Sequence, residues 1–377
     1  PSKEDSSVEE ITKDIIPERA PDQPELPEQE PETPEEARES IADKTRIISP
    51  ARLVVKRFFR SKLSIIGLCM FIFLLIFSFL GPLFVPWGES EADRSGGETM
   101  YTIISIETEI NGEDVIVYSV EEYTPEMNVH ADPFTYSHEG ENSRLHVFGT
   151  DENGRDIFVR LMYGGRLSLM LSFLVVIIYT VIGIILGGLA GYFGKWVDMI
   201  IMRIVDILNC IPSLPILLIV GAIYDGIDGD PSLRIYFMLG ILSLLSWTGV
   251  ARLVRGQILF LREQEYIVAA EALGMGPMRK IFHHLIPNVM PQLIVSMTLG
   301  LGSIILYEAT LSFLGLGVAP DMASWGQMVQ RATQNTDILS YYVMDWLPAG
   351  IMIILAVLSF NFIGDGLRDA LDPKMKR

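Results

Sequence analysis

The side chains of this sequence that could do chemistry are few, and their spacing mostly excludes catalytic sites. Asp151, Asn153 and Asp156 carry the oxygen ligands that calcium prefers. The other ligands of a calcium-binding hand are missing, so we favour a turn that caps the following helix. No histidine or cysteine spacing matches a metal-ligand set, and we expect the cysteines to be small buried hydrophobic residues without a disulfide. These residues are His130, His138, His146, His283, His284, Cys69 and Cys210.

Glu308 is the single charged residue in the long apolar run 289–319. A charge at such a depth in a membrane is costly, so its carboxylate should face protein or a water-filled path. Two interpretations stay open. Glu308 either takes part in a transport pathway or gate, or binds a structural partner such as a backbone amide at a helix break.

The sequence contains no phosphate-binding loop of the Gly-x-x-x-x-Gly-Lys-Ser/Thr type and no nucleophile–base pair. We therefore expect a chain that is not an enzyme and holds no cofactor of its own.

The composition predicts a membrane protein, so the residues named above should lie on or between membrane helices. Hydrophobic residues make up 49% of the chain and charged residues 20%, and the mean hydropathy is +0.34. Six apolar runs are long enough to cross a bilayer, with Pro212 and Pro215 predicting a kink in the third. The predicted spans are 63–85, 167–193, 207–224, 235–251, 289–307 and 346–364.

The net charge of −18 is concentrated outside these runs. Residues 1–45 contain 15 acids against 5 bases and seven prolines, which predicts a disordered tail. The basic segment 46–62 precedes the first span, so we expect both termini and the basic loop 252–288 in the cytoplasm. The acidic segment 86–166 then lies outside. Its alternating residues 102–110 and 114–120, around Asn111-Gly112, predict a β-hairpin in a small extracytoplasmic insertion.

The loop between the fourth and fifth spans predicts two short helices. Tyr266, Ala269, Ala270 and Leu273 have helical spacing and should form one narrow face of mostly small residues. Gly274 should end this first helix, since glycine is favoured just after a helix. Pro277 should begin a second helix and Pro287 should end it. Such a pair could lie on lipid as an amphipathic hairpin, or it could dock against another protein, which the small alanines favour.

The stretch Ala269–Gly274, followed by His284–Asn288, resembles the coupling-loop signature of ATP-binding-cassette importer permeases. In that family the loop docks into a cleft of the ATPase subunit. The residues that match or adjoin this signature are Tyr266, Ala269, Ala270, Glu271, Ala272, Gly274 and Pro287. The family pattern has a glutamate where this sequence has Val268.

Further motifs are similar to the dipeptide, oligopeptide and nickel subfamily, and specifically to its second, C-type permease subunit. These motifs are 148–156, 191–198, 311–317 and 364–373. The resemblance covers roughly residues 52–85 and 147–374. It implies a type I importer permease fold with a core domain at 167–377.

The resemblance also implies partners. They are a homologous permease subunit, two ATPase subunits that bind ATP and magnesium, and an extracytoplasmic substrate-binding protein, in the cytoplasmic membrane of a bacterium or archaeon. The implied substrate is a peptide. Close relatives move nickel chelates, glutathione or oligosaccharides, and a channel or transporter that works without ATP is a further alternative. Nothing in the sequence predicts nucleic-acid binding.

Overall fold

The computed structural model describes residues 50–94, 100–110, 113–123, 127–137, 144–319 and 321–372. Three sequence predictions concern residues outside these ranges. They are the disordered tail 1–45, the start of the basic segment 46–62, and the turn at Asn111-Gly112.

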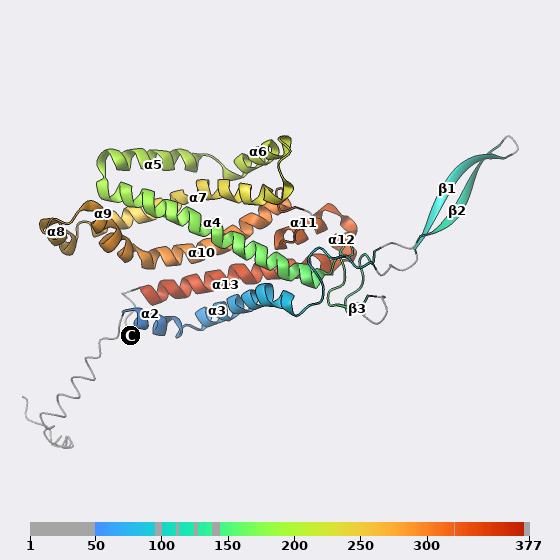
Figure 1. Ribbon diagram of the computed structural model, residues 1–377, viewed down its shortest axis with the longest axis horizontal. Helices are drawn as coiled ribbons and strands as arrows, with labels where there is room; N and C mark the ends of the chain where they lie inside the picture. The colour runs from blue at the N-terminus through green and yellow to red at the C-terminus, as the bar shows by residue number, and fades with distance from the viewer. Residues whose placement is uncertain are drawn as a thin grey trace, which may run out of the picture. The chain divides into compact units, whose positions relative to one another are not determined.

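Helices dominate the described residues (Figure 1). The N-terminal half contains α2 (Pro50–Phe58), α3 (Lys62–Leu75) with its continuation η1 (Ile76–Leu80) and η2 (Gly81–Leu83), α4 (Ile157–Phe193), α5 (Lys195–Cys210) and α6 (Ser213–Gly226). The C-terminal half contains α7 (Pro231–Leu261), α8 (Glu265–Ala272), α9 (Pro277–Lys280), η4 (Ile281–Leu285), α10 (Ile286–Phe313), α11 (Trp325–Gln334), α12 (Thr336–Tyr341), η5 (Val343–Asp345) and α13 (Leu347–Leu371).

Five helical stretches of the described residues are long and apolar enough to cross a membrane, and a bent helix pair makes a possible sixth crossing. The pair is α5 and α6, which meet at 79°. The five stretches are Lys62–Leu83, Ile157–Phe193, Pro231–Leu261, Pro277–Phe313 and Val343–Leu371.

The break between α5 and α6 lies at Ile211-Pro212, inside the span expected at 207–224. A residue that precedes proline is pushed out of the helical region, and Ile211 accordingly has extended backbone angles of φ −95° and ψ 122°. Helix α6 then starts at Ser213. The predicted kink is therefore a full break between two helices, the first of which starts at Lys195.

Three other expected boundaries differ from the structure. Helix α4 begins at Ile157, inside the expected insertion 86–166, because the Asp156 carboxylate accepts the Val159 N–H at 2.8 Å and caps the helix. Helix α7 continues to Leu261, and α10 begins at Ile286. Only residues 262–285 of the expected loop 252–288 therefore lie between these two helices.

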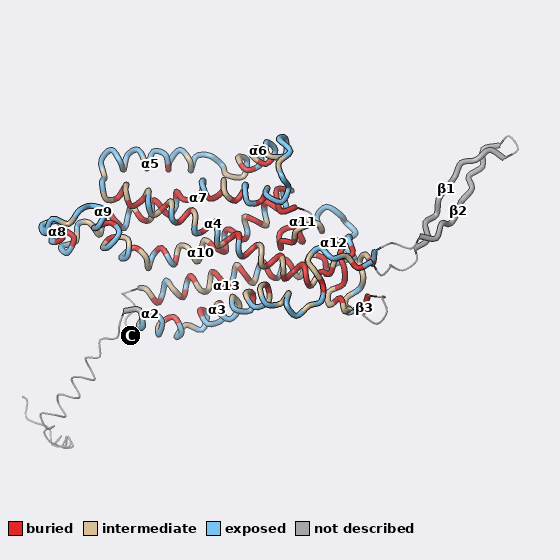
Figure 2. The backbone as a smooth tube through the Cα atoms, viewed as in Figure 1, coloured by how far each residue is buried: buried red, intermediate tan, exposed pale blue. Residues whose placement is uncertain are grey.

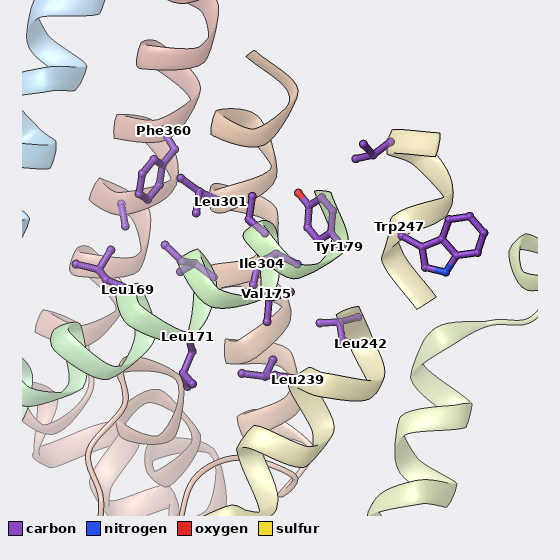
Figure 3. Close-up of a cluster of buried hydrophobic side chains, with 14 of the residues drawn as sticks. Leu169, Leu171, Val175, Tyr179, Leu239, Leu242, Trp247, Leu301, Ile304 and Phe360 are labelled. Carbon is purple, nitrogen blue, oxygen red and sulfur yellow. The ribbon is translucent and has the colours of Figure 1, made fainter. Parts of the chain in front are cut away.

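The core forms where α4 packs between α7 and α10, and where α13 packs against α10 and α3. Apolar side chains from four of these helices meet in the cluster of Figure 3. They include Leu169, Val175 and Tyr179 of α4, Leu239 and Leu242 of α7, Leu301 and Ile304 of α10, and Phe360 of α13.

Small residues let α4 approach α7 closely. A Cβ atom added at Gly183 would lie 2.6 Å from the Val250 Cβ atom, and one at Gly187 would lie 2.9 Å from the Ala251 Cα atom. At Gly188 the nearest atom outside the helix is 3.8 Å away, an ordinary contact. An added Cβ atom at Gly191 would likewise lie 3.0 Å from the Arg255 carbonyl oxygen of α7. Gly183, Gly187 and Gly191 therefore allow the close approach of the two helices, and Gly188 does not take part.

Helix α5 has a different environment from α4. It is exposed along most of its length (Figure 2), with Val205 as its one buried residue. Cys210 at its end is exposed, as is Cys69 in α3, and both are free thiols. The expectation that the cysteines are buried was wrong, because both lie on the outward-facing sides of their apolar helices. An apolar run does not distinguish the two sides.

The segment between α3 and α4 contains two small sheets. Strands β1 (Met100–Ile110) and β2 (Glu113–Tyr123) pair antiparallel, with Ile110 opposite Glu113, so the predicted β-hairpin is confirmed. Strands β3 (Thr135–Tyr136) and β4 (Leu145–His146) form a second antiparallel pair.

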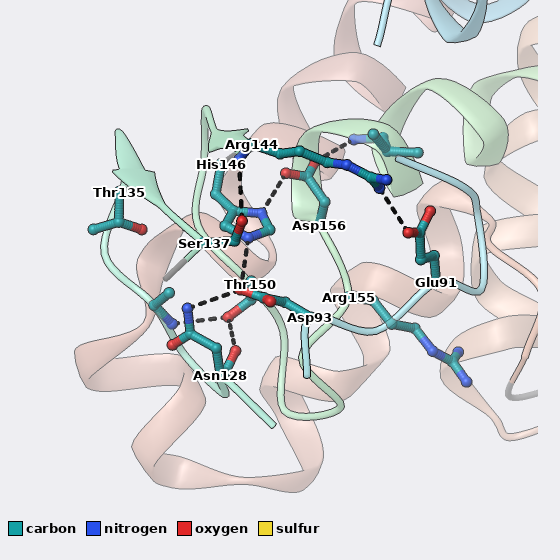
Figure 4. A network of polar contacts seen from close by, with 12 residues as sticks. Glu91, Asp93, Asn128, Thr135, Ser137, Arg144, His146, Thr150, Arg155 and Asp156 are labelled. Carbon is teal, nitrogen blue, oxygen red and sulfur yellow. Dashed lines mark hydrogen bonds and ion pairs between the residues drawn. The ribbon is translucent and has the colours of Figure 1, made fainter. Parts of the chain in front are cut away.

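The base of this segment is joined to α4 by a buried polar network (Figure 4). The His146 ring lies between two carboxylates, with Nδ1 2.8 Å from Asp156 and Nε2 3.1 Å from Asp93. Asn128 donates to the same Asp93 carboxylate at 3.1 Å. Burial alone would lower the pKa of His146, but hydrogen bonds to and charges of Asp156 and Asp93 outweigh it and raise that pKa above 6.5.

The turn before α4 has the role that the sequence favoured. One oxygen of Asp151 accepts the N–H groups of Asn153 and Arg155 at 2.8 and 3.0 Å. The other oxygen binds Arg331 of α11 at 2.6 Å. Together with the cap from Asp156, these contacts give both acidic side chains partners within the protein.

Candidate coupling hairpin and membrane cavity

Helices α8 and α9 form a hairpin between α7 and α10. It is called the α8–α9 hairpin here and comprises residues 264–280. Gly274 ends α8 with a positive φ of 77°. Around this turn the Leu273, Gly274 and Met275 N–H groups donate to the carbonyls of Ala269, Glu271 and Ala270. Left-handed residues of this kind commonly end helices, and glycine adopts them without strain.

One side of α8 faces the protein and the other side is exposed. Ile267 and Ala270, three residues apart, are 2% and 8% exposed. Leu273 at the tip of the hairpin is 87% exposed. Ala270 therefore lies on a different side of α8 from Tyr266, Ala269 and Leu273. The sequence pattern had predicted that all four share one face, and this prediction was wrong. The exposed residues of α8 are Glu265, Tyr266, Val268, Ala269, Glu271 and Ala272, and Leu273 follows them. The α8 tip surface is defined here as Tyr266, Val268, Ala269, Glu271, Ala272 and Leu273.

The interpretation of Pro287 was also wrong. This proline does not end a second short helix but lies in the first turn of α10. The chain passes from α9 through the π-helical turn η4 directly into α10. A proline in a first helical turn leaves no unmade hydrogen bond, which is why the helix can begin there. Asn288 then donates to the Tyr266 hydroxyl at 3.3 Å and ties α10 to α8.

Glu308 lies on α10 and is 1% exposed. Its carboxylate accepts hydrogen bonds from the hydroxyls of Ser168 on α4 at 3.0 Å and Ser312 on α10 at 2.9 Å. Of the two interpretations left open, these contacts favour the structural one, with serine hydroxyls in the place of the expected backbone amide.

A cavity of about 640 Å³ lies between α4, α7 and α10 at the break between α5 and α6. Glu308 is not among its lining residues, and none of the described residues that line it has a charged side chain. Tyr179, Leu242 and Ile304 of the Figure 3 cluster border it. Its polar lining consists of hydroxyl and amide side chains: Tyr179, Asn209, Ser213, Ser246, Thr248, Ser296, Ser303 and Tyr307.

Hydrogen bonds hold the helix break against the rest of the cavity wall. The Ser213 and Tyr307 hydroxyls share a short hydrogen bond between α6 and α10. Asn209, in the last turn of α5, donates to the Val205 carbonyl at 2.7 Å and accepts from Thr248 of α7 at 3.2 Å. The break is thus tied to both α7 and α10.

Our reading of the sequence missed this cavity. A signal was present on α10, where Ser296, Gly300, Ser303 and Tyr307 recur at intervals of three and four residues and so share one helix face. Hydroxyl side chains in a membrane helix can also bond to their own backbone. The pattern alone therefore does not predict a cavity.

Comparison with protein families gives two matches. The family described as "Binding-protein-dependent transport system inner membrane component" matches residues 183–377. The family described as "N-terminal TM domain of oligopeptide transport permease C" matches residues 49–96.

Two curated proteins illustrate the sequence similarity. The dipeptide transport system permease protein DppC of Alkalihalophilus pseudofirmus is 46% identical over 62% of this chain and 74% of its own length. The oligopeptide transport system permease protein OppC of Haemophilus influenzae is 32% identical over 85% of this chain and 87% of its own length.

Among solved structures, a chain of the inward-facing MetNI methionine ABC transporter is 20% identical, with a TM-score of 0.42. That match covers 56% of this chain and 96% of the other. The transport-system family matches just over half of this sequence, and OppC of Haemophilus influenzae is similar over most of both chains. This chain therefore belongs to the inner membrane components of binding-protein-dependent transport systems.

Proposed function

We propose that this chain forms half of the translocation pathway of an ATP-driven peptide importer. The observation that carries the proposal is the α8–α9 hairpin. It lies between α7 and α10 and exposes apolar side chains at its tip, of which Leu273 is 87% exposed. An apolar tip on a short helical hairpin is suited to a protein cleft.

The proposed partners follow from family membership. A homologous permease completes the pathway, two ATPase subunits bind ATP and magnesium, and an extracytoplasmic protein delivers the substrate. This chain acts without catalysis or a cofactor of its own, and ATP hydrolysis takes place in the partners. The α8 tip surface docks into the ATPase, so closure of the ATPase pair displaces α8.

The proposed orientation puts both termini and the α8–α9 hairpin in the cytoplasm of a bacterium or archaeon. Basic residues support it, because positively charged segments stay on the cytoplasmic side. Lys56 and Arg57 lie in the last turn of α2, and Arg279 and Lys280 end α9. The segment between α3 and α4 is then extracytoplasmic.

The proposed cargo is a peptide. Relatives named for dipeptide and oligopeptide transport support this assignment. The cavity also supports it, since hydroxyl and amide groups can exchange hydrogen bonds with the amides of any peptide backbone, whatever its side chains. A nickel chelate is a weaker candidate, because no histidine, cysteine or carboxylate is among the lining residues. Glutathione and oligosaccharides remain as alternatives for the uptake assay.

The docking step is tested with Leu273→Lys. A lysine at the tip would bring a strongly hydrated charge into an apolar cleft, so the ATPase subunits should no longer co-purify and peptide uptake should stop. The matched control is Ile227→Lys, since Ile227 is a 71% exposed apolar residue between α6 and α7, at the other end of these helices. Full ATPase retention by Leu273→Lys would refute docking through α8. ATP-independent uptake by the chain alone would favour a passive transporter.

A further inference from the structure

Lys280, the last residue of α9, has an environment that is uncommon for a lysine. Its side chain is only 4% exposed, whereas the neighbouring Arg279 is exposed. Burying an ammonium group is costly unless it is paired, so the partners of Lys280 must hold it in one place.

The partners of Lys280 come from two other helices. The Lys280 Nζ atom lies 3.2 Å from a carboxylate oxygen of Glu271, near the end of α8. The same atom lies 5.4 Å from the centre of the Tyr192 ring, in the last turn of α4. A cation over an aromatic face is attracted to it, and the attraction grows as water is excluded. One ammonium group thus links α8, α9 and α4.

Other contacts near Lys280 hold the same part of the chain against α4. Arg262, just after α7, donates to the Gly191 carbonyl of α4 at 3.2 Å. Ile281, directly after Lys280, is 2% exposed and packs below Gly188 of α4. The first turn of α8 is held separately, by the bond between Tyr266 and Asn288 of α10. Lys280 therefore connects the last turn of α8 to α4.

We propose that Lys280 is a positioning residue that passes displacement of α8 to α4. This inference rests on the proposed docking of α8 to an ATPase. Helix α4 borders the cavity through Tyr179, so a shift of α4 changes the cavity wall. The link joins the three helices because the Lys280 side chain is largely shielded from solvent and its ammonium contacts Glu271 on one side and Tyr192 on the other.

The test uses the chain reconstituted with its partner permease, both ATPases and the binding protein. Lys280→Met keeps a long apolar stem but removes the charge. We expect ATPase subunits to stay bound and ATP hydrolysis to continue, while peptide moved per ATP falls about tenfold, a typical size for coupling between sites. Lys280→Arg should recover most of the loss, because it restores a cation at the same place.

Two further variants sharpen the result. Arg279→Met makes the same change on the exposed neighbour and should leave the ratio of peptide to ATP unchanged. Tyr192→Leu removes the ring and should lower the ratio, with no additional loss when it is combined with Lys280→Met. An unchanged ratio in Lys280→Met would overturn the proposal. So would loss of ATPase binding in that variant, since the role would then be structural. Failure of docking itself is detected separately by Leu273→Lys.

Discussion

At the scale of single residues, three buried polar groups each combine a partner nearby in sequence with a partner from a distant part of the chain. Glu308 is held by two serine hydroxyls, and Lys280 by a carboxylate and an aromatic ring. His146 is the clearest titratable case. It lies between Asp93 and Asp156, and the Trp87 ring stacks on it with centroids 4.5 Å apart. Asp156 also caps α4, so the charge on His146 bears on where this helix starts.

We predict that His146 makes stability depend on pH. Its folded pKa is raised above 6.5, so its contribution to the unfolding free energy is complete below about 6.5 and is lost as pH rises through the folded value. His146→Gln should flatten this dependence, and below pH 6.5 it should cost about 1–3 kcal/mol by leaving buried carboxylates under-satisfied. Thermal unfolding of the purified protein at a series of pH values measures both effects. Equal pH profiles for the two proteins would contradict the assignment.

At the scale of elements, helix ends decide where the functional surfaces lie. Gly274 turns the chain at the α8 tip, Pro212 separates α5 from α6, and Asp156 starts α4 ten residues before the apolar run. The helix end at Gly274 and a distortion at Pro212 were predicted from the sequence, because glycine and proline restrict or free the backbone at their own positions. The start of α4 was not, since Asp156 in the sequence could equally belong to a turn.

Gly274→Val should abolish uptake while leaving membrane insertion intact. A side chain in the left-handed region costs about 1–2 kcal/mol, and the branched valine fits it poorly, so the end of α8 and the α8 tip surface should shift. Gly276→Val is the matched control. A Cβ atom at either glycine meets nothing within 4 Å, but Gly276 has an ordinary φ of −66°. Uptake and membrane fractionation are measured for both. Equal uptake in the two variants would show that the backbone conformation at 274 is unimportant.

At the scale of the whole molecule, the predicted fold class is confirmed. The chain is a helical membrane protein of the binding-protein-dependent transport family with a small β-hairpin. Its helices line an open cavity where a broken helix pair meets three continuous helices. Because this cavity has no charged lining, a peptide would meet only hydroxyl, amide and apolar groups there.

The cavity predicts a steric effect on transport. Ser303→Trp places a large ring among the lining residues, so peptide uptake should fall to background while the ATPase subunits still co-purify. Ile294→Trp is the control, because Ile294 is an exposed α10 residue outside the lining. Uptake of a labelled peptide into proteoliposomes measures the difference. Normal uptake by Ser303→Trp would place the pathway elsewhere.

The sequence by itself determined the presence of long apolar helices, the β-hairpin and the end of α8 at Gly274. Each of these follows from apolar run length, residue alternation or the backbone preference of one residue, and all are local properties. Only the tertiary structure decided that Ala270 faces inward, that Pro287 lies in the first turn of α10, that Lys280 is shielded from solvent, and that hydroxyl groups of separate helices line one cavity. These features depend on which helix faces pack together. The contacts of Lys280 with Tyr192 and of Ser213 with Tyr307, for example, join side chains more than eighty residues apart in the sequence.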